Sequence, residues 1–76
     1  MQELVEFLAK GLVDNPDEVR VERIERDGAV VLELRVAPDD VGKVIGRQGR
    51  IARALRTIVR ASGARSNERA MLEIVG

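Results

Sequence analysis

The chain has 76 residues and a mass of 8.4 kDa, which is the size of one small domain. It contains no cysteine and no histidine, which excludes disulfides, thiolate or imidazole metal sites, and catalysis that depends on either side chain. Hydrophobic residues make up 45% of the chain and charged residues 34%, a composition typical of folded domains rather than disordered ones. No apolar run approaches the ~20 residues that cross a bilayer, and the acidic start differs from a signal peptide. We therefore expect one soluble domain over residues 1–76 that works in the cytoplasm without membrane contact.

The formal net charge is zero, with 13 basic and 13 acidic side chains, but the charges are unevenly distributed. Residues 1–40 carry five basic and eleven acidic side chains, a net charge of −6. Residues 41–67 carry seven basic side chains and no acidic one, a net charge of +7. Such a basic segment is either a solvated helix face or a surface for a polyanion.

The first half of the chain predicts a helix and then a strand. Apolar residues recur at spacings of three and four between Leu4 and Val13, which predicts an amphipathic helix with Phe7 in its apolar stripe. The helix should end at Asp14-Asn15-Pro16, because the residue before a proline is pushed out of helical geometry. Val19–Arg26 is predicted to be a strand, and a slip of its alternation at Ile24 suggests a bulge.

A hairpin and the clearest strand follow. Asp27-Gly28 is a two-residue hairpin signal. Ala29–Val36 then alternates apolar and polar residues over most of its length, as in a half-buried strand. The side chains expected to face the core are Val30, Leu32, Leu34 and Val36.

The second half of the chain predicts two helices and a last strand. Pro38-Asp39-Asp40 opens a short helix that runs to about Ile45, with either aspartate as the N-cap. A longer helix covers Arg50–Ser62 and is closed by Gly63. At 100° per residue this helix separates an aliphatic face from a basic one, and Arg69–Val75 is the final strand. The arginines on the basic face are Arg50, Arg53, Arg56 and Arg60.

The predicted order is therefore α-β-β-α-α-β. A strand, a two-helix crossover and a strand make the last two strands parallel, while the hairpin makes the first strand antiparallel to its partner. We predict an α+β fold in which three helices pack on one face of a three-stranded mixed sheet.

Four residues, Gly46-Arg47-Gln48-Gly49, link the two later helices. Glycine permits left-handed backbone angles and lets a ligand approach the backbone closely. Gly49 also stands at a helix start, where unpaired N–H groups and the helix dipole favour an anionic oxygen. Arg47 and Arg50 flank this point and supply charge and bidentate hydrogen bonds suited to phosphate.

Other glycine-loop motifs do not fit this segment. The dinucleotide-binding pattern needs a glycine where Val44 stands, and the nucleoside-triphosphate loop needs Ser or Thr after Gly42-Lys43. A purely structural explanation stays open, because two glycines also suit a tight turn between helices.

The wider string resembles the signature of K-homology (KH) domains: Val41-Gly42-Lys43-Val44-Ile45-Gly46-Arg47-Gln48-Gly49-Arg50-Ile51. KH domains use a helix, a GxxG loop and a second helix to clamp about four nucleotides of single strand. The predicted element order is similar to that of type II KH domains. Along essentially its whole length the chain resembles the small bacterial single-KH proteins of the KhpA family.

The resemblance implies which residues meet RNA. The loop residues Gly46, Arg47, Gln48 and Gly49 would hold the sugar-phosphate backbone. Lys43 and Arg50 would add charge at the edge of the groove. Val44, Ile45 and Ile51 align with the aliphatic positions of the motif, and Ile45 and Ile51 are favoured as core residues over base contacts. Arg53, Arg56 and Arg60 are left between phosphate contact and a solvated face.

The leading hypothesis is a non-catalytic single-stranded RNA-binding protein, and the resemblance adds an RNA-chaperone role with links to the bacterial cell wall and cell shape. The resemblance also implies self-association and partnership with a larger KH protein, KhpB. The alternative hypothesis is accordingly a protein-interaction module in which RNA binding is secondary. No cofactor or metal is expected.

An enzyme is the weakest hypothesis. Its candidate carboxylate pairs are Asp39 with Asp40, and Asp14 with Asp17. Helix capping accounts for both pairs without any chemistry.

Overall fold

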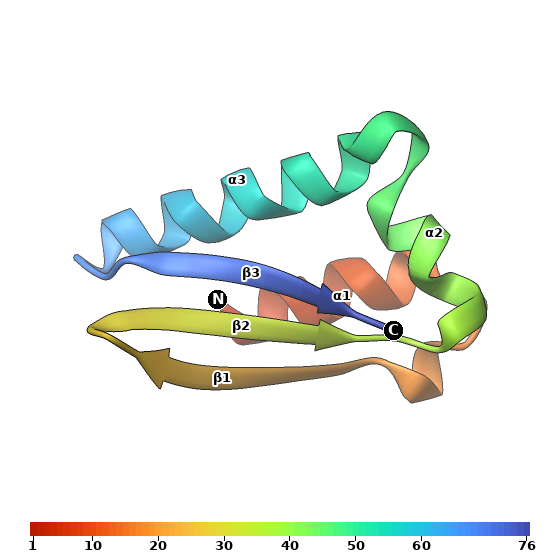
Figure 1. The fold of residues 1–76 in the computed structure, drawn as a ribbon, viewed down its shortest axis with the longest axis horizontal. Helices are drawn as coiled ribbons and strands as arrows, with labels where there is room; N and C mark the ends of the chain where they lie inside the picture. The colour runs from red at the N-terminus through yellow and green to blue at the C-terminus, as the bar shows by residue number, and fades with distance from the viewer.

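Three helices cover one face of a three-stranded sheet in the computed structural model, which describes residues 1–76 (Figure 1). The predicted α+β class and the α-β-β-α-α-β order are confirmed, with short 3₁₀ turns added at Pro16–Glu18, Pro38–Asp40 and Arg47–Gly49. The helices and strands are α1 (Gln2–Leu12), β1 (Arg20–Arg26), β2 (Ala29–Arg35), α2 (Val41–Ile45), α3 (Arg50–Arg65) and β3 (Ala70–Val75). None of the helices is long and apolar enough to cross a membrane.

The sheet has the strand order β1-β2-β3, with β1 antiparallel and β3 parallel to the central β2. The β1–β2 register runs unbroken from the Arg20–Arg35 pair to the Arg26–Ala29 pair, so the predicted bulge is wrong. In a regular strand, side chains three residues apart point to opposite faces of the sheet. Val21 therefore lies on the helix-covered face and Ile24 on the opposite face, which accounts for the change of phase in the sequence pattern. β3 is an edge strand, which leaves one side of the sheet open beside α3 (Figure 1).

The core lies between the helices and the covered face of the sheet. Alternate residues of β2 point into it, as the sequence predicts, and Leu32 and Leu34 are fully buried. α1 contributes Val5 and Ala9 from one side of its helix. The other members of the buried cluster are Val19, Val30, Val36, Val44, Leu55, Val59, Ala70 and Leu72.

Phe7 does not belong to this core, so its placement in the buried stripe is wrong. Its side chain is 74% exposed, and Leu4 and Leu12 are also exposed. At about 100° per residue, Phe7 lies about 200° around α1 from Val5, which is fully buried. The apolar residues of α1 therefore extend beyond the side that packs on the sheet, and those on its outer side face solvent.

α3 runs two residues past its predicted closing glycine and ends at Arg65. Gly63 lies inside the helix and is buried. A Cβ at this position would lie 2.7 Å from the Cβ of Ala70 and 2.8 Å from the carbonyl oxygen of Glu68. Gly63 therefore serves the close approach of α3 to the start of β3, rather than the end of the helix.

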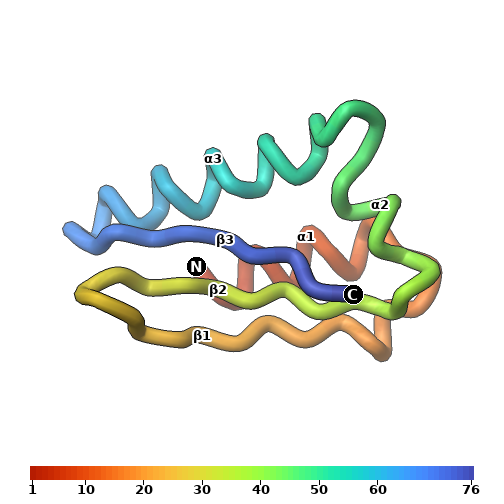
Figure 2. The backbone as a smooth tube through the Cα atoms, viewed as in Figure 1, coloured from red at the N-terminus to blue at the C-terminus, as the bar shows by residue number.

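The α2–α3 turn and the β1–β2 hairpin lie at opposite ends of the molecule. Figure 2 shows the chain leaving α2 and reversing into α3 at a projecting corner. α3 then runs the length of the sheet towards the hairpin end, so one rigid helix connects the two ends (Figure 1).

We predict that Gly63→Ala destabilises the fold by about 1–3 kcal/mol, because the neighbouring backbone must move to admit the methyl group. Gly11→Ala in α1 is the matched control, since nothing lies within 4 Å of its Cβ. The control should be neutral or stabilising by up to about 1 kcal/mol through helix propensity. Urea unfolding checks both, and equal stability of the two variants would contradict the close-packing role.

Candidate nucleic-acid interface

The turn between α2 and α3 depends on backbone angles that favour glycine. Gly46 has φ 76° and Gly49 has φ 73°, and Gln48 between them also has a positive φ of 58°. A Cβ at Gly46 would lie 2.6 Å from Cγ1 of Ile51. Gly46 is therefore required both for its backbone angle and for the contact with Ile51.

Hydrogen bonds within the turn give it a fixed shape. The N–H of Gly46 donates to the carbonyl oxygen of Gly42 at 2.9 Å, and the N–H of Gly49 donates to that of Gly46 at 3.1 Å. Nη2 of Arg53 donates to the carbonyl oxygen of Gln48 at 3.2 Å. The amide of Gly49, expected from the sequence to be free for an anion, is used inside the turn. A ligand would therefore meet mainly the exposed side chains of Arg47 and Gln48.

The arginines that follow this turn have no carboxylate within ion-pair distance. All seven ion pairs of the protein involve other basic residues. All five arginines are exposed: Arg47 lies in the turn itself, and the other four face solvent along one side of α3. We call this row the arginine face; it consists of Arg47, Arg50, Arg53, Arg56 and Arg60.

Lys43 differs from the arginines, because its charge is balanced within the protein. Its Nζ lies 2.8 Å from Oδ2 of Asp14 and 3.4 Å from Oδ1 of Asp40. The hydrogen bond to Asp14 raises the pKa of Lys43, although partial desolvation opposes the shift. The predicted contribution of Lys43 to the charge of the groove edge is therefore reduced.

Asp40 is the one buried charged residue, with no exposed surface. Its carboxylate accepts hydrogen bonds from the backbone N–H groups of Asp14 (3.2 Å) and Asn15 (3.0 Å) and from the Asn15 side chain (3.0 Å). Burial would raise the pKa of Asp40, but these bonds and the one from Lys43 lower it below its ordinary value. Asp40 makes no helix-cap bond; it ties α2 to the segment that follows α1, a role that the sequence pattern does not reveal.

The aliphatic residues of the motif divide between core and surface. Val44 has no exposed surface, so it anchors α2 to the core and offers RNA no direct contact. Ile51 is half-buried and packs on the core beside Gly46. Ile45 is 37% exposed, so the preference for a core position is wrong there. α2 has only five residues, and Val44 is the one whose side chain points into the core. Ile45, the next residue, faces solvent beside the loop.

A second surface lies on the other flank of α3, between that helix and α1. This apolar hollow measures about 620 Å³ and has Lys10 and Arg50 at its edge. Its main lining residues are Phe7, Leu8, Leu12, Ile51, Leu55 and Ile58. Since Phe7 is 74% exposed there, the protein presents apolar surface on this flank.

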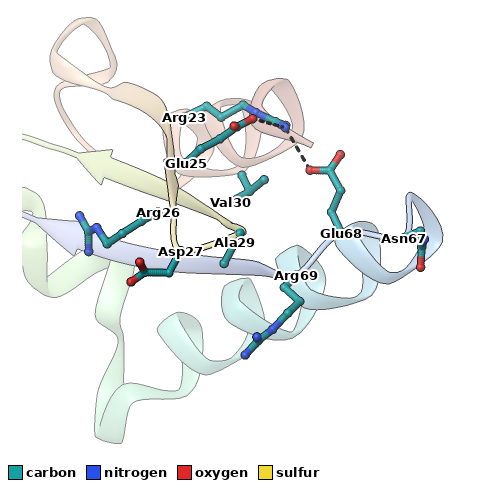
Figure 3. A pocket seen from close by; sticks show the side chains of 10 residues that line it. Arg23, Glu25, Arg26, Asp27, Ala29, Val30, Asn67, Glu68 and Arg69 are labelled. Atoms are coloured by element: carbon teal, nitrogen blue, oxygen red, sulfur yellow. Dashed lines mark hydrogen bonds and ion pairs between the residues drawn. The ribbon is translucent and has the colours of Figure 1, made fainter.

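The hollow at the hairpin end has a different character (Figure 3). Nη2 of Arg23 lies 3.0 Å from Oε2 of Glu68 and 3.7 Å from Oε1 of Glu25, so its charge is balanced. No group of three or more acidic side chains is arranged to hold a metal ion. One member of each predicted carboxylate pair, Asp40 and Asp14 respectively, forms an ion pair with Lys43.

The fold, the glycine turn and the exposed arginines together define a KH-type domain. The family model described as "KhpA/KhpB, KH domain" matches residues 2–74, and the chain belongs to this family. No solved structure gives a significant match.

Several curated relatives carry the name RNA-binding protein KhpA. The relative from Clostridium acetobutylicum is 51% identical over 75 residues, covering 99% of this chain and 100% of its own. The relative from Aquifex aeolicus is 57% identical over 75 residues, covering 99% and 95%. The relative from Streptomyces coelicolor is 58% identical over 65 residues, covering 86% and 82%.

We predict that Asp40→Asn lowers the urea midpoint of unfolding at pH 7, because one amide oxygen cannot satisfy the donors that the carboxylate accepts. The folded pKa of Asp40 lies below the unfolded value near 3.8, so its stabilisation is present above that pH. It is lost as the pH falls through the folded pKa, and the gap between variant and wild type should narrow there. Asp39→Asn, an exposed neighbour, is the control and should change little. A wild-type midpoint at pH 7 in the Asp40 variant would contradict this role.

Proposed function

We propose that this protein binds single-stranded RNA without catalysing a reaction and holds the RNA backbone with the Gly46–Gly49 loop and the arginine face. The observation that carries the proposal is the row of five exposed arginines with no carboxylate partner, in a protein of zero net charge. The names of the curated relatives point to the same class of ligand.

The geometry suits a chain of phosphates. Arg47 lies in the turn and Arg50 is the first residue of α3, and a guanidinium group binds phosphate oxygens in a bidentate manner. Nothing lies within 4 Å of the place that a Cβ of Gly49 would take, so a backbone phosphate can approach the turn closely there, whereas the corresponding space at Gly46 is filled by Ile51. The positive end of the α3 dipole adds to the attraction.

Base recognition should be weak. Ile45 is the exposed aliphatic residue next to the loop, and the single aromatic residue, Phe7, lies on the α1 side of α3. The 1–3 kcal/mol per base that aromatic stacking typically contributes is therefore missing from this surface. Phosphate contacts carry little sequence information, so we expect broad sequence tolerance, which fits an RNA chaperone in the cytoplasm.

Replacing Arg47 and Gln48 together by Asp should reduce affinity for single-stranded RNA at least about tenfold, because charge-assisted hydrogen bonds are lost and two negative charges are gained. Aspartate tolerates the positive φ at position 48, and both side chains are exposed, so the fold should persist. Fluorescence anisotropy with a labelled oligonucleotide measures the effect. The wild-type affinity should also fall with salt at a log–log slope near −2 to −3, as about three to four neutralised phosphates require.

The matched control is Arg65→Asp with Ser66→Asp, which makes the same change of charge at the far end of α3. It should leave most of the affinity for a four-nucleotide strand bound at the loop intact. A folded loop variant that binds RNA as well as wild type would refute the proposal.

The apolar hollow favours a second function, assembly with another KH domain. Phe7, Leu12 and Ile58 face the hollow between α1 and α3, on the opposite flank of α3 from Arg56 and Arg60. Exposed apolar surface of this kind marks a protein contact more often than a nucleic-acid contact. We propose that a second copy of the chain, or a KhpB-like KH protein, covers this flank.

We expect Phe7→Glu to shift the protein to a monomer in light scattering, because a charge would be buried against apolar surface in the assembly. Met71→Glu is the control, since Met71 is also exposed (53%) but lies on β3, away from the hollow. Nuclease treatment should leave the wild-type mass unchanged. A wild type that is monomeric at high concentration would contradict the assembly proposal.

A further inference from the structure

α3 has two flanks that differ in chemistry. Its buried line is Ala52, Leu55, Val59 and Gly63. At 100° per residue, Ile58 lies on one side of that line, towards α1, while Arg56 and Arg60 lie on the other. The second side borders β3, the open edge strand of the sheet.

At the far end of this side, a hollow of about 480 Å³ lies between the last turns of α3 and the start of β3. Both charged and apolar residues line it, among them Arg26, Arg60, Ala64, Arg69 and Met71. Arg60 and Arg69 have no carboxylate partner, and Met71 is 53% exposed. The hollow therefore combines free guanidinium groups with an exposed thioether, which suits a phosphate next to a base.

Two acidic residues, Asp27 and Glu68, also line the same hollow. Glu68 is paired with Arg23, at 3.0 Å. Figure 3 shows Arg69 extending away from this pair. The carboxylates close the basic surface at the hairpin end and would repel a strand that continued past it.

The spacing along α3 connects this hollow with the loop. Arg50 and Arg60 are ten residues apart, which is about 15 Å along the helix axis. At a stacked spacing of about 3.4 Å per nucleotide, this distance corresponds to about four nucleotides. A GxxG loop clamps about four nucleotides by itself.

We propose that the RNA strand continues from the loop along the arginine face and ends in a second subsite, where Arg60 and Arg69 hold a phosphate and Met71 contacts a base. The footprint is then about eight nucleotides rather than four. This inference rests on the proposed RNA-binding function and adds a second, separable site to it.

The test compares four- and eight-nucleotide single-stranded RNAs of uniform sequence, measured by NMR titration and by fluorescence anisotropy. If the protein contacts only four nucleotides, an eight-nucleotide strand should bind about fivefold more tightly than a four-nucleotide one, because it can occupy the site in five registers. A second subsite with two charge-assisted contacts should raise the gain to about 30-fold or more. The salt slope should also steepen by about 0.7, as one further neutralised phosphate requires.

Arg69→Gln with Met71→Ala, two exposed residues outside both the loop and the arginine face, should reduce the length gain to about fivefold and leave four-nucleotide binding within twofold of wild type. The matched control is Arg65→Gln, at the same end of α3 but on its other flank, which should retain the full gain. Circular dichroism verifies that the variants are folded.

The outcomes separate the two proposals. If the loop variant loses affinity for both RNAs but the Arg69 and Met71 variant keeps the wild-type length gain, the second subsite is overturned and RNA binding stands. If wild type binds neither RNA, the proposed function fails and the subsite with it.

Discussion

The hydrogen bonds of the buried Asp40 carboxylate fix the relation between the two halves of the domain. They connect the segment after α1 to the start of α2, and α2 in turn sets the position of the glycine turn. An unpaired buried carboxylate would be costly, so the fold has to supply all of these donors at once. The same carboxylate also forms an ion pair with Lys43, so the unpaired positive charge beside the glycine turn comes from the arginine face.

Charge and apolar surface are arranged around a single helix. The acidic half of the chain neutralises some of its own basic residues, as Glu25 does for Arg23 and Glu33 for Arg35. No acidic residue occurs between positions 41 and 67, so the arginine face has no carboxylate nearby in sequence, and the fold brings none within ion-pair distance. A protein with zero net charge can therefore present a locally strong positive field, which is the property that attracts a polyanion.

Local patterns predicted the element order, the inward residues of β2 and the glycine turn, because each depends on neighbours in the sequence. Features set by contacts between distant segments were missed. Phe7 is exposed because the apolar residues of α1 extend around the helix beyond the side that packs on the sheet. Gly63 is buried because α3 approaches Ala70 closely at that point. Asp40 looked like a helix cap because its true partners precede it by 25 or 26 residues.

The candidate site shows the same division. The loop and its arginines could be found from spacing and charge alone. Whether Val44 or Ile45 faces solvent depends on how a five-residue helix is rotated against the core, which no periodicity over so short a segment defines. The hollow at the end of α3 joins residues from α3, β2 and β3, and so has no signature in one stretch of sequence.

The two flanks of α3 have a consequence for any complex that uses both. A strand lying along the β3 side and a protein seated on the α1 side would meet at Arg50, which borders the α1 hollow, and elsewhere the helix separates them. A twofold assembly through the α1 side would turn both arginine faces outwards. Two RNA segments bound to one such assembly would be at a high local concentration relative to each other, which favours pairing between complementary strands.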